Sequence, residues 1–153
     1  MRGNSYDVSN KGVAAPATCV EESNEDNDDF ASAAPVAADT TIPGLAGCAA
    51  DPDWYSVNLT AGDEITASIA FAHAAGDLNL RLLSPTGSTV ATSLSSTDNE
   101  SIGPYTAAST GSYRIHVYLD SESDGVPGNS YDLSNTLVAA PPPCVQDSNE
   151  DND

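Results

Sequence analysis

The residues best suited to chemistry in this sequence are two clusters of oxygen-bearing side chains. Glu25, Asn27 and Asp28 form the first cluster, and Asp51 and Asp53 form the second, just before an apolar segment. Calcium takes about six to eight hard oxygen ligands, usually several carboxylates together with amide or backbone carbonyls. Closely spaced carboxylates repel one another until a cation compensates them. The sequence therefore predicts a Ca2+ site if folding brings the clusters together; the alternative is a solvated acidic linker.

The overall charge excludes several classes of partner. The formal net charge is -19, with only four Lys and Arg residues. A field of this sign excludes binding to nucleic-acid backbones and disfavours anionic membrane surfaces, whereas small cations are suitable partners. No apolar run reaches the roughly 18 residues of a transmembrane helix, so membrane insertion is not expected. Polar residues follow Gly3 directly, so no signal peptide is expected and the start is interpreted as an excision boundary.

Nucleophilic catalysis has little support in the sequence, and no catalytic residue is predicted. The chain contains no Gly-x-Ser-x-Gly elbow. His73 follows a candidate strand and His116 falls on a predicted outward face, so both are interpreted as ordinary surface histidines. Trp54 is expected in the core, while Tyr118 is a weak candidate for an exposed contact. These observations predict that the chain is not an enzyme.

An internal repeat organises the chain. The segment Gly-Asn-Ser-Tyr-Asp-Val-Ser-Asn at 3–10 recurs at 128–135 with Leu in place of Val, a period of 125 residues. The same offset relates the acidic segment 23–28 to 148–153. A period of this length is that of a domain rather than of a solenoid repeat, which spans about 20 to 50 residues. The chain is therefore interpreted as one complete bead of a tandem array with parts of its two neighbours.

Four segments follow from this interpretation. Residues 1–12 would be the closing strand of a preceding repeat, and residues 13–21 an Ala/Pro linker. Residues 22–136 would form the complete domain, and residues 137–153 a second linker with the truncated start of the next repeat. The duplicate strand at 3–10 lacks its own sheet, so it is either disordered or paired with an exposed strand edge of a neighbouring copy. Partners are thus expected among neighbouring repeats or copies of the chain itself.

The three cysteines fit the same period. Cys19 and Cys144 are repeat equivalents, while Cys48 stands alone within the bead. A bond that recurs in each bead would join Cys19 to Cys48, and Cys144 would pair with a cysteine beyond this sequence. A disulfide indicates an oxidising compartment. The alternative is that the cysteines are free and buried in the core.

Short alternating apolar runs between turn residues predict an all-β fold, an antiparallel β-sandwich or jelly-roll-like single domain. Gly, Pro and Asp separate the runs, and no helical period is sustained. Alternation places Tyr113, Ile115 and Val117 toward the core. The expected strands are 54–59, 64–71, 78–83, 89–93, 101–107, 112–119 and 130–133.

A series of segments in fixed order has the spacing of a known family. They are the acidic opening at 25–33, Asp-Pro-Asp-Trp-Tyr-Ser-Val-Asn-Leu at 51–59, Ala-Gly-Asp at 61–63, Gly-Asp-Leu-Asn-Leu-Arg-Leu-Leu at 76–83, Pro-Thr-Gly at 85–87, Gly-Ser-Tyr-Arg-Ile-His-Val at 111–117 and Ser-Tyr-Asp-Leu at 130–133. In this order, over about residues 22–135, the chain resembles the bacterial pre-peptidase C-terminal domain. That domain is a β-sandwich appended to many secreted peptidases, and in collagenases it is a collagen-binding module.

The resemblance implies a non-catalytic sandwich exported as part of a larger protein, without peptidase activity of its own. Calcium-binding members of the family use a Glu and an Asn-Asp pair in the incoming segment and Asp residues before the aromatic strand. It therefore implies the metal ligands Glu25, Asn27, Asp28, Asp51 and Asp53. One departure is Ser23, where such members often carry a further acidic residue.

Two functions are consistent with these observations. The first is a structural spacer in a secreted or cell-surface bacterial protein, such as a stalk, adhesin or extracellular filament, stabilised by calcium and assembling by strand exchange between repeats. The alternative is a module that targets a secreted peptidase to an extracellular polymer such as collagen or polysaccharide. Near-identical tandem repetition favours the spacer, because a targeting module is usually present in one or two copies.

Overall fold

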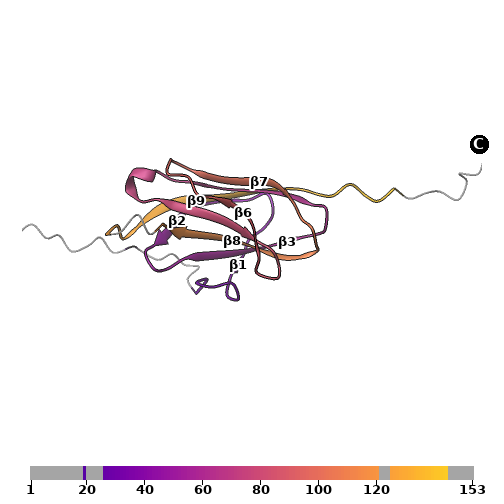
Figure 1. Ribbon diagram of the computed structural model, residues 1–153, viewed down its shortest axis with the longest axis horizontal. Coiled ribbons are helices and arrows are strands. Elements are labelled where there is room, and N and C mark those ends of the chain that lie inside the picture. The colour runs from indigo at the N-terminus through magenta and orange to yellow at the C-terminus, as the bar shows by residue number, and fades with distance from the viewer. Residues whose placement is uncertain (1–18, 20–25, 121–124, 145–153) are drawn as a thin grey trace, which may run out of the picture.

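The domain is a sandwich of two β-sheets whose strands run along the long axis of the molecule (Figure 1). The computed structural model describes residues 19, 26–120 and 125–144. One sheet has the strand order β1-β3-β8-β5-β6 and the other β2-β9-β4-β7. The strands are β1 (Ala34–Pro35), β2 (Thr41–Cys48), β3 (Asp53–Leu59), β4 (Glu64–Ala70), β5 (Leu78–Leu83), β6 (Thr89–Ser93), β7 (Glu100–Thr106), β8 (Gly111–Leu119) and β9 (Gly128–Val138), with one 3-10 turn, η2 (His73–Ala75).

Two strands organise the sheets. β8 is antiparallel to both β3 and β5, and β9 is antiparallel to both β2 and β4. Among the strands of the described residues, only the short β1 pairs in parallel, with β3. The predicted all-β sandwich is therefore confirmed.

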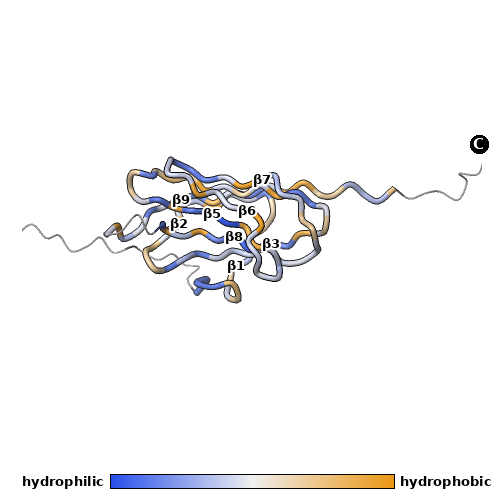
Figure 2. The backbone as a smooth tube through the Cα atoms, viewed as in Figure 1, coloured by the Kyte–Doolittle hydropathy of each residue, from blue (hydrophilic) through white to orange (hydrophobic). Residues whose placement is uncertain are grey.

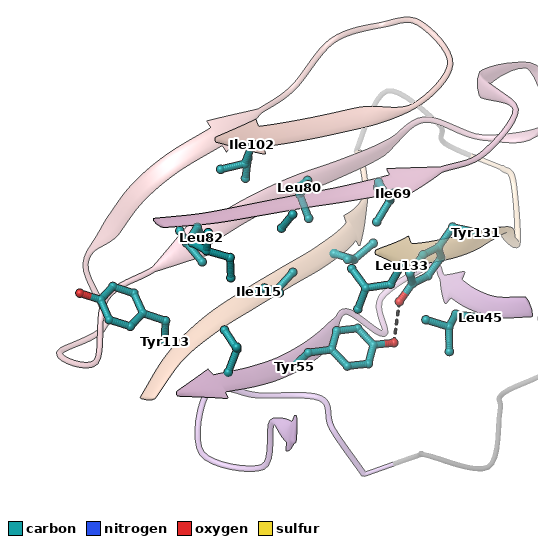
Figure 3. Close-up of a cluster of buried hydrophobic side chains, with 14 of the residues drawn as sticks. Leu45, Tyr55, Ile69, Leu80, Leu82, Ile102, Tyr113, Ile115, Tyr131 and Leu133 are labelled. Carbon is teal, nitrogen blue, oxygen red and sulfur yellow. Dashed lines mark hydrogen bonds between the residues drawn. The ribbon is translucent and has the colours of Figure 1, made fainter. Parts of the chain in front are cut away.

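The core lies between the two sheets and follows the predicted alternation (Figure 3). Hydrophobic and hydrophilic residues succeed one another along the strands (Figure 2). Burying one face of each sheet supplies most of the favourable free energy of such a fold. The fully buried side chains include Ile65 and Ile69 of β4, Leu78, Leu80 and Leu82 of β5, and Ile115 and Val117 of β8.

The expected position of Trp54 is wrong. In β3 the inward residues are Asp53, Tyr55 and Val57, and Trp54 is only partly buried on the outer face. Successive residues of a strand point to opposite faces. The apolar Val57 therefore determines which residues point inward and leaves Trp54 outside.

The sequence prediction also missed β2 and shortened β9. β2 contains Pro43 and Gly44, which do not read as a strand. It is an edge strand with a register irregularity between Ile42 and Leu45, where a proline without an N–H is tolerated. β9 continues to Val138, two residues past the predicted domain boundary.

Several expectations concern residues outside the described ranges. The closing strand at 1–12 lies there, as does the linker 13–21 except Cys19. So do residues 145–153 of the second linker and the acidic Glu25. Among the described residues, no helix is long and apolar enough to cross a membrane.

Candidate functional site

The incoming segment is fixed to the start of β3 by Asn27. The backbone N–H of Trp54 donates to the Asn27 carbonyl at 2.9 Å, and Asn27 Nδ2 donates to the Trp54 carbonyl at 3.2 Å. Asn27 is buried. A buried amide with both backbone and side chain engaged is a structural anchor. It carries the neighbouring Asp28 to the loop that precedes β3.

Asp28 and Asp51 lie beside each other at this corner. Partial desolvation, followed by the neighbouring Asp51 carboxylate, raises the pKa of Asp28. Two adjacent carboxylates disfavour each other's charged form, and a divalent cation between them removes that cost. This part of the predicted ligand set fits a hard cation.

Asp53 has a different environment. Its side chain points into the sandwich, where it is 4% exposed. The Tyr131 hydroxyl donates to Asp53 Oδ2 at 2.7 Å, and the Tyr55 hydroxyl lies 2.7 Å from that of Tyr131 (Figure 3). The Asp53 carboxylate is thus tied into the core by Tyr131.

The structure therefore brings Asp28 and Asp51 together, anchors Asn27 beside them and turns Asp53 inward. Glu25 lies outside the described residues. Within the described ranges, no three His, Cys, Asp or Glu side chains gather closely enough to form a metal-binding group by themselves. Calcium binding stays a prediction.

The outer face of the five-stranded sheet carries a row of four rings, here called the ring ladder: Phe30, Trp54, His116 and Tyr118. Trp54 and His116 stack with centroids 4.0 Å apart and an interplanar angle of 13°. His116 stacks on Tyr118 at 4.8 Å, and Phe30 meets Trp54 edge-on at 6.0 Å. Because the rings cover one another's faces, His116 is a partly buried member of a stack rather than a free surface histidine.

Two cations lie over the ends of the ring ladder. The Arg114 guanidinium carbon is 4.4 Å from the centroid of Phe30, and that of Arg81 is 4.6 Å from the centroid of Tyr118. Such contacts stabilise by about 0.5 to 1 kcal/mol at exposed sites. Sequence reasoning missed the ladder because Arg81 and His116 meet only through the register of β5 against β8.

The ring ladder should make the domain less stable in mild acid. Burial, and then the Arg81 guanidinium, lower the pKa of His116 from 6.5 to about 4. Between these two values the unfolded chain binds a proton that the folded chain does not, so stability falls as the pH falls from about 6.5 to about 4. We expect a loss of about 1 to 2 kcal/mol for this half-buried ring, after allowing for solvent screening.

Urea unfolding at pH 7, 5.5 and 4.5 measures this loss. The variant His116→Phe keeps a ring in the ladder and should flatten the pH dependence, whereas His73→Gln, on η2, should leave most of it. An unchanged slope in His116→Phe would contradict the assignment.

A disulfide joins Cys19 to Cys48 with the Cα atoms 5.6 Å apart, as the repeat period predicts. Cys144 is free and exposed. The bond lies against the first residue of β9, because a Cβ on Gly128 would come within 2.7 Å of Cys19 Sγ. The backbone φ of Gly128, +156°, also favours glycine at this position. The disulfide thus attaches Cys19, which precedes the incoming acidic segment, to the place where β9 begins.

These features define a two-sheet β-sandwich module with an acidic corner on the incoming segment. Residues 51–119 match the family model of the bacterial pre-peptidase C-terminal domain, which confirms the resemblance seen in the sequence. That domain is a non-catalytic module. The match begins at Asp51, so it includes β3 to β8 but not the incoming acidic segment.

Two solved structures share the fold. The pre-peptidase C-terminal domain of collagenase from Bacillus anthracis superposes with a TM-score of 0.56 at 19% identity, covering 68% of this chain and 94% of that one. PliG of Aeromonas hydrophila, a periplasmic inhibitor of g-type lysozyme, superposes with a TM-score of 0.53 at 17% identity, covering 69% and 96%. No curated protein sequence matches the chain significantly.

Proposed function

We propose that the domain is a structural spacer, one bead of a tandem array in a secreted or cell-surface bacterial protein. The observation that carries the proposal is the position of its two attachment points. The first attachment point is Cys48, which is disulfide-bonded to Cys19 and pairs with Gly128 at the start of β9. The second is the end of β9, because the outgoing segment follows Val138. Eleven residues of strand separate them, roughly 34 Å at about 3.4 Å per residue. The tail after β9, yellow in Figure 1, leaves at the end of the long axis opposite the end of β2.

The outgoing segment is held as well as positioned. Asp63 Oδ1 accepts the backbone N–H of Ala140 at 2.9 Å, and Asp63 Oδ2 accepts that of Thr60 at 2.8 Å. These two bonds lower the pKa of Asp63. The contact is therefore strongest above the ordinary Asp pKa and is lost as the pH falls through the lowered value. A linker fixed at both ends transmits the orientation of one bead to the next.

A tandem array also explains the disulfide and the free thiol. Cys144 is the repeat equivalent of Cys19 and follows the outgoing linker. In an array it would pair with the equivalent of Cys48 in the next bead, so that every linker is covalently attached to the domain that follows. The bond, and the periplasmic setting of the similar PliG, support an oxidising, extracytoplasmic location.

Strand exchange is part of the proposal. The segment 3–10, outside the described residues, differs from the first eight residues of β9 only by Val8 in place of Leu133. β9 is an interior strand of its sheet, where it contributes the buried Tyr131 and Leu133. A near-copy has the chemistry to occupy the same position in another copy of the domain and so to link chains.

We also propose that calcium stiffens the incoming segment. Asp28 and Asp51 belong to segments on either side of β2, and a shared cation would join them directly. The raised pKa of Asp28 supports a site whose charges are uncompensated without metal.

The spacer is tested by small-angle X-ray scattering on a chain of three repeats. The expected result is an elongated particle whose maximum dimension increases by a nearly constant step from one to three beads. Asp63→Ala in every repeat should shorten the average dimension by releasing Ala140.

The matched control is Glu64→Ala, which removes the same charge from an exposed neighbour. The spacer function would be refuted if the beads tumbled independently and the Asp63→Ala and Glu64→Ala variants had the same maximum dimension. Specific retention of the single domain on collagen or polysaccharide would favour the targeting module instead.

Calcium is tested by thermal unfolding with excess calcium and with chelator at fixed ionic strength. A metal that binds only the folded state stabilises by RT ln(1 + [L]/Kd), about 2.7 kcal/mol at a hundred times Kd. Asp51→Asn should abolish the calcium shift. In chelator, the Asp51→Asn variant should have a thermal midpoint at or above that of the wild type, because the substitution removes the repulsion between Asp51 and Asp28.

Glu64→Gln is the control for a change in net charge and should keep the full calcium shift. Superimposable wild-type curves with and without calcium would exclude a stabilising site.

A further inference from the structure

Arg81 and Arg114 lie on the same face of the five-stranded sheet, yet only one of them has polar partners. Arg114 donates to the carbonyls of Phe30 and Ser112 at 2.8 and 3.0 Å, and to Ser112 Oγ at 2.6 Å. Arg81 is partly buried over Tyr118, but its side chain makes no hydrogen bond and no ion pair with any described residue. Guanidinium groups in such positions usually bind a planar acceptor.

The unpartnered guanidinium lines a pocket that contains a second unpartnered polar group. The pocket has a volume of about 260 Å³, and Arg81, His116 and Tyr118 form part of its lining. His116 Nε2 is buried and has no hydrogen-bond partner among the described residues. Buried polar atoms are normally paired, so the unpaired nitrogen and the guanidinium without a polar partner together favour a polar ligand here.

The remaining walls limit what that ligand is. Leu119, Pro52 and Cys48 supply mainly apolar surface. The volume lies slightly below the range of about 300 to 1,000 Å³ usual for drug-sized ligands, which favours a small molecule. Asp51, which also lines the pocket, disfavours a dianion such as phosphate more than a monoanion.

A sugar stacked on the rings is also disfavoured. Sugar recognition needs an open aromatic face, whereas His116 stacks on both Trp54 and Tyr118. Arg81 lies over Tyr118 in addition. The ring ladder therefore holds Arg81 and His116 in place and offers little open ring surface of its own.

We propose that this pocket binds a small organic acid, with its carboxylate on the Arg81 guanidinium and beside His116, and its apolar part against Leu119 and Pro52. A carboxylate matches the two parallel N–H donors of a guanidinium. In a protein of net charge -19, such an anion is held by one local cation rather than by the general field, so binding requires Arg81 itself. The site goes beyond the spacer function, which does not depend on it.

Titration of the 15N-labelled domain with benzoate, followed by NMR, tests the site. Saturable shifts should centre on β5, the C-terminal half of β8 and residues 48–52. Benzamide, the uncharged analogue, should bind at least tenfold more weakly. Arg81→Gln should weaken benzoate binding at least tenfold without changing the fold, and Arg81→Lys should give an intermediate affinity.

The matched control is Arg114→Gln, which removes the same charge from the same face outside the pocket and should change the affinity by less than about twofold. Equal losses in the Arg81→Gln and Arg114→Gln variants would reduce the effect to general electrostatics and overturn the proposal, as would the absence of saturable shifts. N-acetyl-phenylalanine separates two sources of the carboxylate. Tighter binding than benzoate would indicate a peptide C-terminus, and equal or weaker binding a free organic acid.

Discussion

Removing the Cys19–Cys48 disulfide should lower the free energy of unfolding by about 3 to 4 kcal/mol. The bond closes a loop of 29 residues, and the chain-entropy model assigns a cost of this size to leaving such a loop open in the unfolded chain. The double variant Cys19→Ser, Cys48→Ser should therefore unfold at a lower urea concentration with a similar slope against denaturant. A domain of this size has a total stability of about 5 to 15 kcal/mol, so the loss is a large fraction.

Cys144→Ser is the matched control, because Cys144 is free and exposed and its replacement should change stability by less than about 0.5 kcal/mol. Measurements with chelator present keep metal binding out of the comparison. If the double variant unfolded together with the control, the bond would contribute nothing to this domain. The spacer would then lose its covalent link between bead and linker.

The strands that the sequence predicted most accurately are those with unambiguous alternation. The run Leu78–Leu83 was predicted with the observed bounds, because Leu78, Leu80 and Leu82 alternate and turn residues flank them. Trp54 was expected on the inward alternation of its strand, but the inward residues are Asp53, Tyr55, Val57 and Leu59. The polar Ser56 and Asn58, two and four residues further on, were the signal that Trp54 points outward.

The candidate sites were predictable to different degrees. The disulfide was expected from the repeat period, because Cys19 and Cys144 are repeat equivalents and Cys48 stands alone; the alternative of free buried cysteines is excluded for this pair by the observed bond. That Asp28 and Asp51 lie side by side was expected on the family resemblance, because 23 residues of chain separate them and no local pattern joins them. The pairing of Arg81 with His116 depends on the register between β5 and β8, which alternation does not fix.

The second large effect is expected for Tyr131→Phe, which should lower the free energy of unfolding by about 2 to 3 kcal/mol. The Tyr131 hydroxyl donates to Asp53 Oδ2 and lies 2.7 Å from the Tyr55 hydroxyl. Its loss removes one donor from a buried carboxylate, and a hydrogen bond to a charged group contributes about 1.5 to 3 kcal/mol. Burial, then the Asp53 carboxylate and Tyr55, raise the pKa of Tyr131 well above 10.0, so the donor persists into alkaline solution.

Tyr55→Phe is the matched control, because it removes a hydroxyl of the same size from the same buried pair. It leaves the bond between Tyr131 and Asp53 intact, so its cost should be about 1 kcal/mol. Equal losses in the two variants, measured by urea unfolding with chelator, would mean that Asp53 does not depend on Tyr131. A larger loss for Tyr131→Phe would show that Asp53 is held by the core in the absence of metal. Any contribution of Asp53 to calcium binding would then come from a carboxylate that folding has already oriented, and the incoming segment with Asp28 would be the part that calcium has to bring into place.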